Sequence, residues 1–138
     1  MQNRRFPLSA LKVSLSLAVF ISLLLTSNPL FACKIDLKAA GEVKELYKVG
    51  DVIDLNLVVA FTHRACPTAI NETEFNVEGL EISEATDWKE TKPGMIFEKA
   101  MKLKVLSNKD GKLKLSVVRE CPREGGFGSI SFKAEPLK

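Results

Sequence analysis

The chain has 138 residues, of which 46% are hydrophobic, and its formal net charge at pH 7 is +3. Arg4, Arg5 and Lys12 account for this whole excess, so the residues after position 32 carry 17 basic and 17 acidic side chains. Nucleic acids and anionic membrane surfaces attract proteins through a surplus of Lys and Arg gathered on one surface. The balanced charge after position 32 therefore argues against a nucleic-acid-binding protein.

Residues 1–32 have the pattern of an export signal. A basic start is followed by a continuous apolar run, Val13–Leu25, and Ala32 supplies the small residue that a signal peptidase requires. This run is shorter than the roughly 20 residues that a transmembrane helix needs. We therefore expect cleavage to leave one domain, residues 33–138, with no transmembrane span. The expected location is the periplasm or cell surface of a bacterium, or otherwise the secreted fraction.

The first part of the mature chain shows the period of a β-strand. Apolar side chains recur at every second position, and a helical spacing is seldom sustained. A first strand is predicted with Ile35, Leu37 and Ala39 pointing inward. After the turn-like Val49-Gly50-Asp51, a longer strand places five residues on one face: Ile53, Leu55, Leu57, Val59 and Phe61.

Five further strands are predicted in the rest of the chain. Two are short, at 74–77 and 80–85, and a longer one follows the turn Lys92-Pro93-Gly94 and covers 96–106. The turn Asn108-Lys109-Asp110-Gly111 separates this strand from the last two. Their inward-facing residues are Leu113, Leu115 and Val117 in one strand, and Ile130 and Phe132 in the other.

About seven short strands separated by regular turn signals predict an all-β protein. The expected fold is an antiparallel β-sandwich of immunoglobulin type, with two sheets around a single core. The alternative is a small antiparallel barrel or meander, in which the connection at 108–111 is a simple hairpin.

The segment Tyr47-Lys48-Val49-Gly50-Asp51-Val52-Ile53, followed by a long alternating strand, resembles the opening of many bacterial extracytoplasmic immunoglobulin-like domains. The resemblance implies the fold class and carries no functional residue across. Antibody-type domains have a tryptophan on the third strand. Trp88 lies later in this chain, near the turn before the strand predicted at 96–106.

Three cysteines and the single histidine are predicted to meet at one end, or pole, of the sandwich. If consecutive strands alternate in direction, the first strand begins where the second and the sixth end. Cys33, His63, Cys66 and Cys121 would then converge, although they are far apart in the sequence.

The first hypothesis for this pole is a disulfide between Cys66 and Cys121. Exported proteins usually meet oxidising conditions, which favour disulfides. The bond would close a loop of about 55 residues and stabilise the fold by about 4 kcal/mol through chain entropy. Pro67 and Pro122 would end the strands after each cysteine, because proline has no N–H to donate. Pairing of Cys33 with Cys66 or Cys121 is the alternative.

Cys33 itself has several interpretations. Leu30-Phe31-Ala32-Cys33 approximates the bacterial lipobox, so Cys33 is a candidate site of lipid attachment that would make the protein a lipoprotein. Phe31 and the Asn28-Pro29 pair depart from that pattern. Cleavage after Ala32 without lipidation would leave Cys33 as a thiol, a disulfide partner or a metal ligand.

A metal site is the second hypothesis for the same residues. His63 and Cys66 have a spacing that one strand end and its following turn can wrap around an ion. With Cys33 and Cys121 they would form a Cys3His tetrahedron suited to zinc or copper. The structural alternative makes His63 a rim residue that covers the core.

The three arginines after position 32 flank these cysteines. Arg64, Arg119 and Arg123 are predicted to form a rim that binds an anion or a carboxylate, beside the glycines of segment 125–128. In the structural alternative the arginines pair with Glu120 and Glu124, and the glycines permit a tight turn.

No catalytic motif is recognisable in the chain. It has one histidine and no nucleophile elbow, and a His63–Cys66 dyad would lack a third orienting group. We therefore expect an exported, non-enzymatic binding or interaction module without a cofactor, stabilised by a disulfide, whose partner is a protein or another component of the envelope. The alternative is an extracytoplasmic protein that binds zinc or copper, and thiol redox chemistry ranks third.

Overall fold

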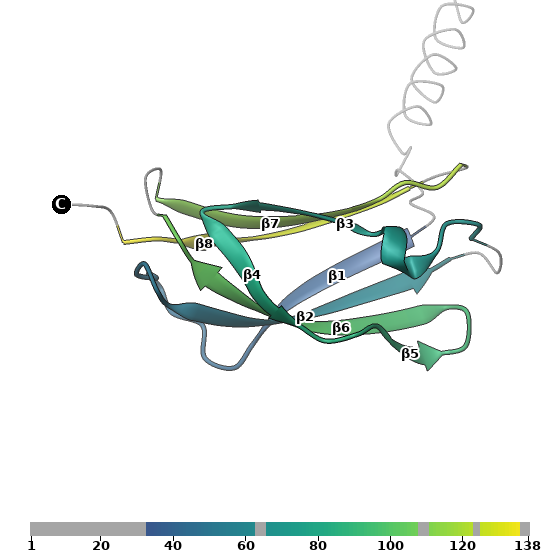
Figure 1. The fold of residues 1–138 in the computed structure, drawn as a ribbon, viewed down its shortest axis with the longest axis horizontal. Coiled ribbons are helices and arrows are strands. Elements are labelled where there is room, and N and C mark those ends of the chain that lie inside the picture. Colours follow the sequence, from purple (N-terminus) through teal and green to yellow (C-terminus); the bar gives the residue numbers. More distant parts are fainter. Residues whose placement is uncertain (1–32, 63–65, 108–110, 123–124, 136–138) are drawn as a thin grey trace, which may run out of the picture. The chain divides into compact units, whose positions relative to one another are not determined.

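The computed structural model describes residues 33–62, 66–107, 111–122 and 125–135, which form β-strands and one short 3-10 helix (Figure 1). The expected signal peptide, residues 1–32, and the predicted turn residues 108–110 lie outside the described residues. Among the described residues, the structure contains no apolar helix long enough to span a bilayer. The elements are β1 (Cys33–Ala40), β2 (Val52–Phe61), η1 (Ile70–Glu72), β3 (Glu74–Glu78), β4 (Leu80–Ala85), β5 (Lys89–Lys92), β6 (Ile96–Val105), β7 (Lys112–Arg119) and β8 (Gly126–Lys133).

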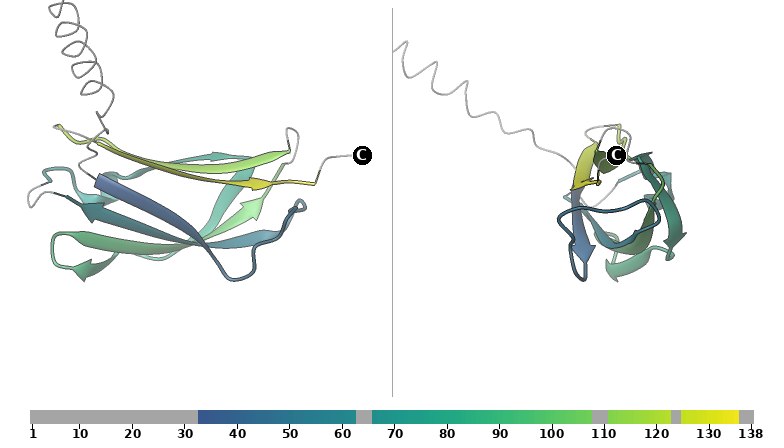
Figure 2. Two further views of the ribbon diagram at one scale, coloured as in Figure 1. Left: turned by 180° about the vertical axis from the view of Figure 1, so that it is seen from behind. Right: turned by 90° about the vertical axis from the view of Figure 1, so that its left-hand side faces the viewer.

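The strands form two antiparallel sheets that pack on each other as layers (Figures 1 and 2). One sheet has the order β1-β2-β6-β4, with β5 also paired to β6, and the other has the order β3-β7-β8. The predicted all-β, two-sheet architecture is confirmed. Because β6 and β7 belong to different sheets, the hairpin predicted at 108–111 by the barrel or meander alternative is wrong.

The core lies between the two sheets and follows the predicted alternation. All five predicted inward residues of β2 are buried, and so are Leu113, Leu115 and Val117 of β7. Ile35, Leu37 and Ala39 of β1 pack against this core but are only partly buried. Their exposure is expected because β1 is an edge strand of its sheet. The sequence pattern does not predict β5, because its four residues are all exposed and show no alternation.

Two glycines close one side of the sandwich by bringing β8 against β1. A Cβ atom on Gly126 would lie 2.6 Å from the carbonyl oxygen of Cys33, and one on Gly128 would lie 2.6 Å from Cγ2 of Ile35. In the end view of Figure 2, β1 (blue) and β8 (yellow) lie on the same side. Only residues without a side chain permit this approach between the two sheets.

On the other side, the chain crosses between the sheets at Gly79, which joins β3 to β4. Gly79 has φ +68°, and a Cβ atom there would lie 2.8 Å from the carbonyl oxygen of Ser107. Both the positive φ and the lack of space require glycine. The remainder of this side, between β3 and β5, is not closed by a described strand.

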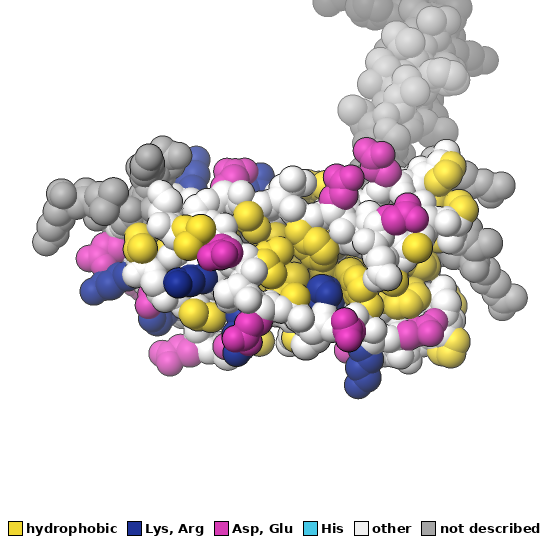
Figure 3. All heavy atoms as spheres, in the orientation of Figure 1, with side chains coloured by type: hydrophobic (Ala, Val, Ile, Leu, Met, Phe, Trp, Pro, Cys, Tyr) yellow, Lys and Arg dark blue, Asp and Glu magenta, His cyan; other side chains and the backbone are white. Residues whose placement is uncertain are grey.

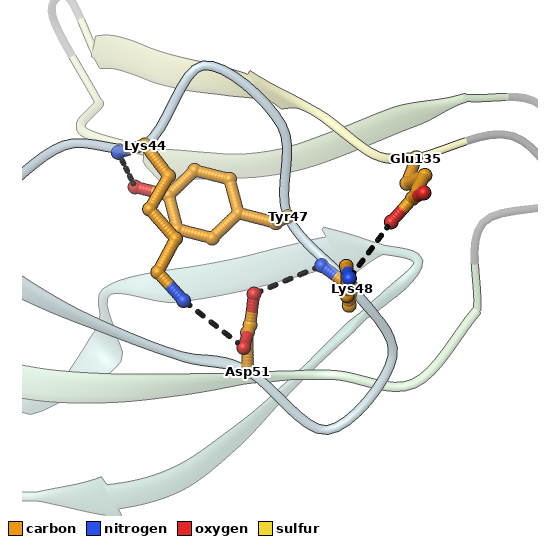
Figure 4. A network of polar contacts seen from close by, with 5 residues as sticks. All are labelled: Lys44, Tyr47, Lys48, Asp51 and Glu135. Atoms are coloured by element: carbon orange, nitrogen blue, oxygen red, sulfur yellow. Dashed lines mark hydrogen bonds and ion pairs between the residues drawn. The ribbon is translucent and has the colours of Figure 1, made fainter.

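The end of the molecule opposite the cysteines is held by Tyr47, in the connection between β1 and β2. Tyr47 is buried, forms a bridge with Ala134, and packs edge-on against Phe132 at 5.5 Å between ring centroids. Its hydroxyl accepts a 3.1 Å hydrogen bond from the backbone N–H of Lys44 (Figure 4). These contacts tie the β1–β2 connection to the end of β8.

Asp51 ties together the same connection through two lysines (Figure 4). Its carboxylate accepts a 2.9 Å hydrogen bond from the backbone N–H of Lys48 and forms a 3.1 Å ion pair with Lys44. Lys48 in turn forms a 3.6 Å ion pair with Glu135. The hydrogen bond from Lys48, followed by the contact with Lys44, lowers the pKa of Asp51 from its ordinary value of 3.8.

The lowered pKa of Asp51 predicts a stability contribution that depends on pH. Because the folded-state pKa lies below the unfolded value of 3.8, the contribution is present above pH 3.8 and is lost as the pH falls through the folded-state pKa. Thermal unfolding should show Asp51→Asn melting below the wild type at pH 7, with the gap closing in strong acid. Asp36→Asn, which breaks only an exposed ion pair with Lys38 on β1, is the control. A gap for Asp51→Asn that stays constant with pH would contradict this assignment.

Candidate functional site

The strand directions bring three of the four predicted pole residues together. Cys33 begins β1 and is paired with Phe61 at the end of β2, while Arg119 ends β7. The sulfur atoms of Cys66 and Cys121 lie 3.5 Å apart. Cys66 and Cys121 both act to raise the pKa of Cys33, so its sulfur lies near theirs. His63, Arg64 and Arg123 lie outside the described residues.

The contact between Cys66 and Cys121 is the pairing that the sequence predicts, without the covalent bond. A disulfide joins its sulfurs at about 2.05 Å, whereas these two sulfurs are separated by 3.5 Å. Both residues are half-buried. The structure therefore shows two neighbouring thiols, and the disulfide itself stays a prediction.

Arg119 lies inside this pole, where the sequence analysis expected an exposed rim. Its side chain is only 1% exposed, and the guanidinium faces the chain itself. Nη1 donates to the carbonyl oxygens of Ala69 and Ile70, both at 3.1 Å, and to Oγ1 of Thr73 at 2.7 Å. Nη2 donates to the carbonyl oxygen of Thr68 at 3.0 Å. Arg119 therefore holds the connection between β2 and β3 in place.

Burial of Arg119 is compensated by these hydrogen bonds and by an aromatic ring. The guanidinium carbon lies 4.9 Å from the ring centroid of Phe61, a cation–π contact. Nε has no hydrogen-bond partner among the described residues. No described contact joins Arg119 to Glu120, and Glu124, the other predicted partner, lies outside the described residues.

The same guanidinium influences two of the cysteines, with different results. Burial raises the pKa of Cys33, although a hydrogen bond from Arg119 acts in the opposite direction. Burial also acts to raise the pKa of Cys66, but it is outweighed by hydrogen bonds from the backbone of Thr68, from Cys121 and from Arg119. The pKa of Cys66 is therefore lowered. Of Cys33 and Cys66, Cys66 therefore forms a thiolate more readily.

The metal site predicted from the same residues has little support in this arrangement. Within the described ranges, no group of three or more His, Cys, Asp or Glu side chains is placed to hold a metal ion. His63, the fourth predicted ligand, lies outside those ranges. Nη2 of Arg119 lies 4.0 Å from the sulfur of Cys66, so its positive charge would repel a cation bound there.

The position of Cys33 also bears on lipid attachment. Its side chain is 1% exposed and its sulfur contacts Arg119 between the sheets. A lipid linked to that sulfur would have to leave the core together with the start of β1. Lipidation of Cys33 stays a prediction, and it would require a different arrangement of residue 33.

A groove on the open side of the sandwich is the second candidate site, and the sequence analysis did not anticipate it. Its volume is about 580 Å³. Figure 3 shows hydrophobic side chains exposed between the two sheets here, in the region between η1 and β5 of Figure 1. The lining residues are Ile70, Asn71, Phe75, Asp87, Trp88, Glu90, Phe97 and Lys99.

Aromatic residues from three separate segments form the apolar part of the groove. The rings of Phe75 on β3 and Trp88 before β5 stack with centroids 6.5 Å apart. Phe97 on β6 packs against Phe61, which also contacts Arg119. The groove and the cysteine pole are thus neighbouring parts of one end of the sandwich.

A second hollow lies on the outer face of the five-stranded sheet. It has a volume of about 530 Å³, and its lining includes Asp36, Lys38, Asn56 and Glu98. Charges of both signs alternate along it, as on a solvated sheet face. Its lining contains no aromatic side chain, whereas half-buried aromatic side chains line the groove.

The chain was compared with models of protein families, with curated proteins and with solved structures. None of the three comparisons finds a match. The functional assignment therefore depends on the geometry of the pole and the groove.

Proposed function

We propose that this chain is an exported, non-enzymatic binding module that holds an extended segment of a partner protein in the groove between β3 and β5. Its fold is proposed to be an immunoglobulin-like sandwich. The strand orders β1-β2-β6-β4 and β3-β7-β8 support this, because constant-type immunoglobulin domains arrange seven strands as ABED and CFG. Export is supported by the sequence pattern of residues 1–32.

The observation that carries the proposal is the apolar lining of the open side, which is only partly buried. Phe75 lines the groove from the core side of β3, and Val77 on the same side of the strand remains 39% exposed because no described strand covers it. An apolar surface with a polar rim is typical of a site that binds another molecule. Because β3 is an edge strand, it also offers backbone groups to which an extended peptide can add.

The charges around the groove indicate the kind of segment that fits. Asp87 and Glu90 line it, and Glu74 and Glu78 are exposed on β3. The one lysine in the lining, Lys99, is occupied by the ring of Trp88, 5.3 Å away, and by the carbonyl oxygen of Thr86. A segment with apolar residues facing the groove and alternating Lys or Arg residues would complement this rim.

Trp88 makes this proposal directly testable, because it is the only tryptophan of the chain and it lines the groove. A peptide of alternating valine and lysine should change the fluorescence of Trp88 on titration. It should bind about tenfold more tightly than the alternating valine and glutamate peptide, since each cross-strand charge pair contributes roughly 0.2–1 kcal/mol. Equal binding of both peptides, or no change in fluorescence, would contradict the proposal.

A pair of variants locates the binding surface. Phe75→Ala should weaken binding of the valine and lysine peptide about tenfold or more, because buried aromatic residues dominate small interfaces. Leu106→Ala is the matched control, since Leu106 is 51% exposed but lies outside the groove. An equal effect of both substitutions would place the binding elsewhere.

The intact mass of the alkylated protein distinguishes the disulfide-bonded module from the metal-binding alternative. The proposed module is oxidised between Cys66 and Cys121, so native protein alkylated after denaturation without reductant should carry a label on Cys33 alone. The alternative function, zinc or copper binding, predicts three labelled cysteines and loss of one metal ion on denaturation. The contact between the Cys66 and Cys121 sulfurs favours the first outcome.

A further inference from the structure

The pole combines two neighbouring half-buried sulfurs with a cationic side chain and a third, buried sulfur. Cys66 and Cys121 lie in contact near the surface, and Cys33 is buried behind them. Structural disulfides need none of the polar contacts that surround Cys66 here. The backbone N–H of Thr68 and the guanidinium of Arg119 both act on its sulfur.

These contacts stabilise the reduced form of the pair. A thiolate on Cys66 would accept the hydrogen bond of Thr68 and lie 4.0 Å from the positive charge of Arg119. A sulfur in a disulfide has no negative charge and gains little from either contact. Whatever stabilises the thiolate makes the disulfide easier to reduce. The Cys66–Cys121 bond should therefore stabilise the fold by less than loop closure alone predicts.

We propose that Cys66 and Cys121 form a reversible thiol–disulfide site that exchanges with low-molecular-weight disulfides outside the cytosol. Cys66 is the attacking sulfur and Cys121 the resolving sulfur. Both residues are half-buried, whereas Cys33 is 1% exposed and stays a thiol throughout. Exchange is independent of peptide binding in the groove.

The reaction has two balanced steps. The Cys66 thiolate attacks one sulfur of the external disulfide, so that its S–S bond breaks and a mixed disulfide forms on Cys66. The other half leaves as a thiolate and takes up a proton. Cys121 then loses its proton and attacks the sulfur of Cys66, which releases the second half as a thiol. Two protein thiols are oxidised, and one external disulfide is reduced to two thiols.

The difference between Cys66 and Cys33 explains why the pair, and not the buried sulfur, reacts. Only thiolates attack disulfides, and the pKa of Cys66 is lowered while burial raises the pKa of Cys33. Arg119 contacts both sulfurs, but it is held in place by the oxygens of residues 68–70 and 73. Its charge therefore stays beside Cys66 in either oxidation state.

The test follows the reaction of reduced protein with oxidised glutathione, quenched in acid and read by intact mass. The wild type should form its internal disulfide without accumulating an adduct, and Cys121→Ser should accumulate one glutathione on Cys66. Cys66→Ser should react at Cys121 about tenfold more slowly at neutral pH, since only the thiolate attacks. Cys33→Ser should behave like the wild type.

Two further measurements use only the folded wild-type protein, so they do not depend on whether the variants fold. In the folded wild-type protein, limiting iodoacetamide followed by peptide mapping should label Cys66 before Cys33. In buffers with different ratios of oxidised to reduced glutathione, the fraction of wild-type protein that carries the disulfide should change gradually with that ratio. The proposal would be overturned if Cys66→Ser and Cys121→Ser reacted at equal rates, or if Cys33 were labelled first. It would also be overturned if glutathione could not reduce the disulfide in the folded protein. Binding of the valine and lysine peptide to the same samples reports separately on the groove.

Discussion

Replacing Arg119 by methionine is expected to lower the free energy of unfolding by about 1–3 kcal/mol, because the buried guanidinium donates four hydrogen bonds at the pole. The substitution fills a similar volume but removes the guanidinium hydrogen bonds to the oxygens of Thr68, Ala69, Ile70 and Thr73. The carbonyl oxygens of Ala69 and Ile70 keep hydrogen bonds from the backbone N–H groups of Glu72 and Thr73. Removing a buried charge recovers part of this loss, because the guanidinium no longer has to be kept out of water. Urea unfolding of both proteins in the presence of reductant measures the difference without a contribution from sulfur oxidation.

Two comparisons make the Arg119 prediction specific. Lys34→Met removes a positive charge from an exposed position on β1 at the same pole and should change stability by no more than about 0.5 kcal/mol. Arg119→Met should also weaken peptide binding, because Ile70 lines the groove and its carbonyl oxygen accepts from Arg119. A loss of stability below about 1 kcal/mol would mean that water replaces the guanidinium at these acceptors.

Gly126→Ala is expected to cost about 3 kcal/mol, at the upper end of the range for overpacked cores. The new Cβ atom would lie 2.6 Å from the carbonyl oxygen of Cys33 and 2.8 Å from its Cβ, so β1 or β8 must shift. Both neighbours belong to the start of β1, which is paired with β2 over its whole length and has little freedom to yield. Thermal or urea unfolding measures the effect.

Ser129→Ala on the same strand is the control for Gly126→Ala. Ser129 is exposed, and its replacement should change stability by no more than about 0.5 kcal/mol. Displacement of β1 should also expose Cys33, so the variant should react with iodoacetamide at Cys33 faster than the wild type does. Unchanged stability together with unchanged labelling would show that the two strands are farther apart in solution.

The strands were predictable where one face of the sheet is buried. Alternation placed every second residue of β2 from Ile53 to Phe61 on the correct face. The predicted bounds of β4 match the observed ones. The same physical rule failed for β5, because Lys89–Lys92 is exposed on both faces and has no apolar side chain to alternate. The sequence predicted β6 and the turn Lys92-Pro93-Gly94 before it, and the structure confirms the turn with a hydrogen bond from the backbone N–H of Met95 to the carbonyl oxygen of Lys92.

The cysteine pole was predicted from strand direction alone, but the role of Arg119 was not. Alternation along β7 places Arg119 on the inward face, the face of Val117. A charged residue at a strand end is normally exposed, so the sequence favoured a rim. The acceptors that make its burial tolerable are backbone oxygens of residues 68–70, which no sequence pattern identifies as neighbours of residue 119.

The groove could not be predicted from the sequence because it depends on the distance between the sheets. Phe75, Trp88 and Phe97 come from separate segments, and each is a normal core residue by its type. Their partial exposure arises because the β3 side of the sandwich is open while the β1 side is closed by Gly126 and Gly128.

The one-sided closure of the sandwich also limits how copies of this protein can associate. Edge strands are the usual route to aggregation, since each can pair with a strand of another molecule. Fibres need two such edges facing in different directions, so that every added copy offers a new end. Here β1 and β8 cover each other, and the edges of β3 and β5 open to the same side. Two copies that met through these edges would occupy each other's open side, and growth would end at a closed pair.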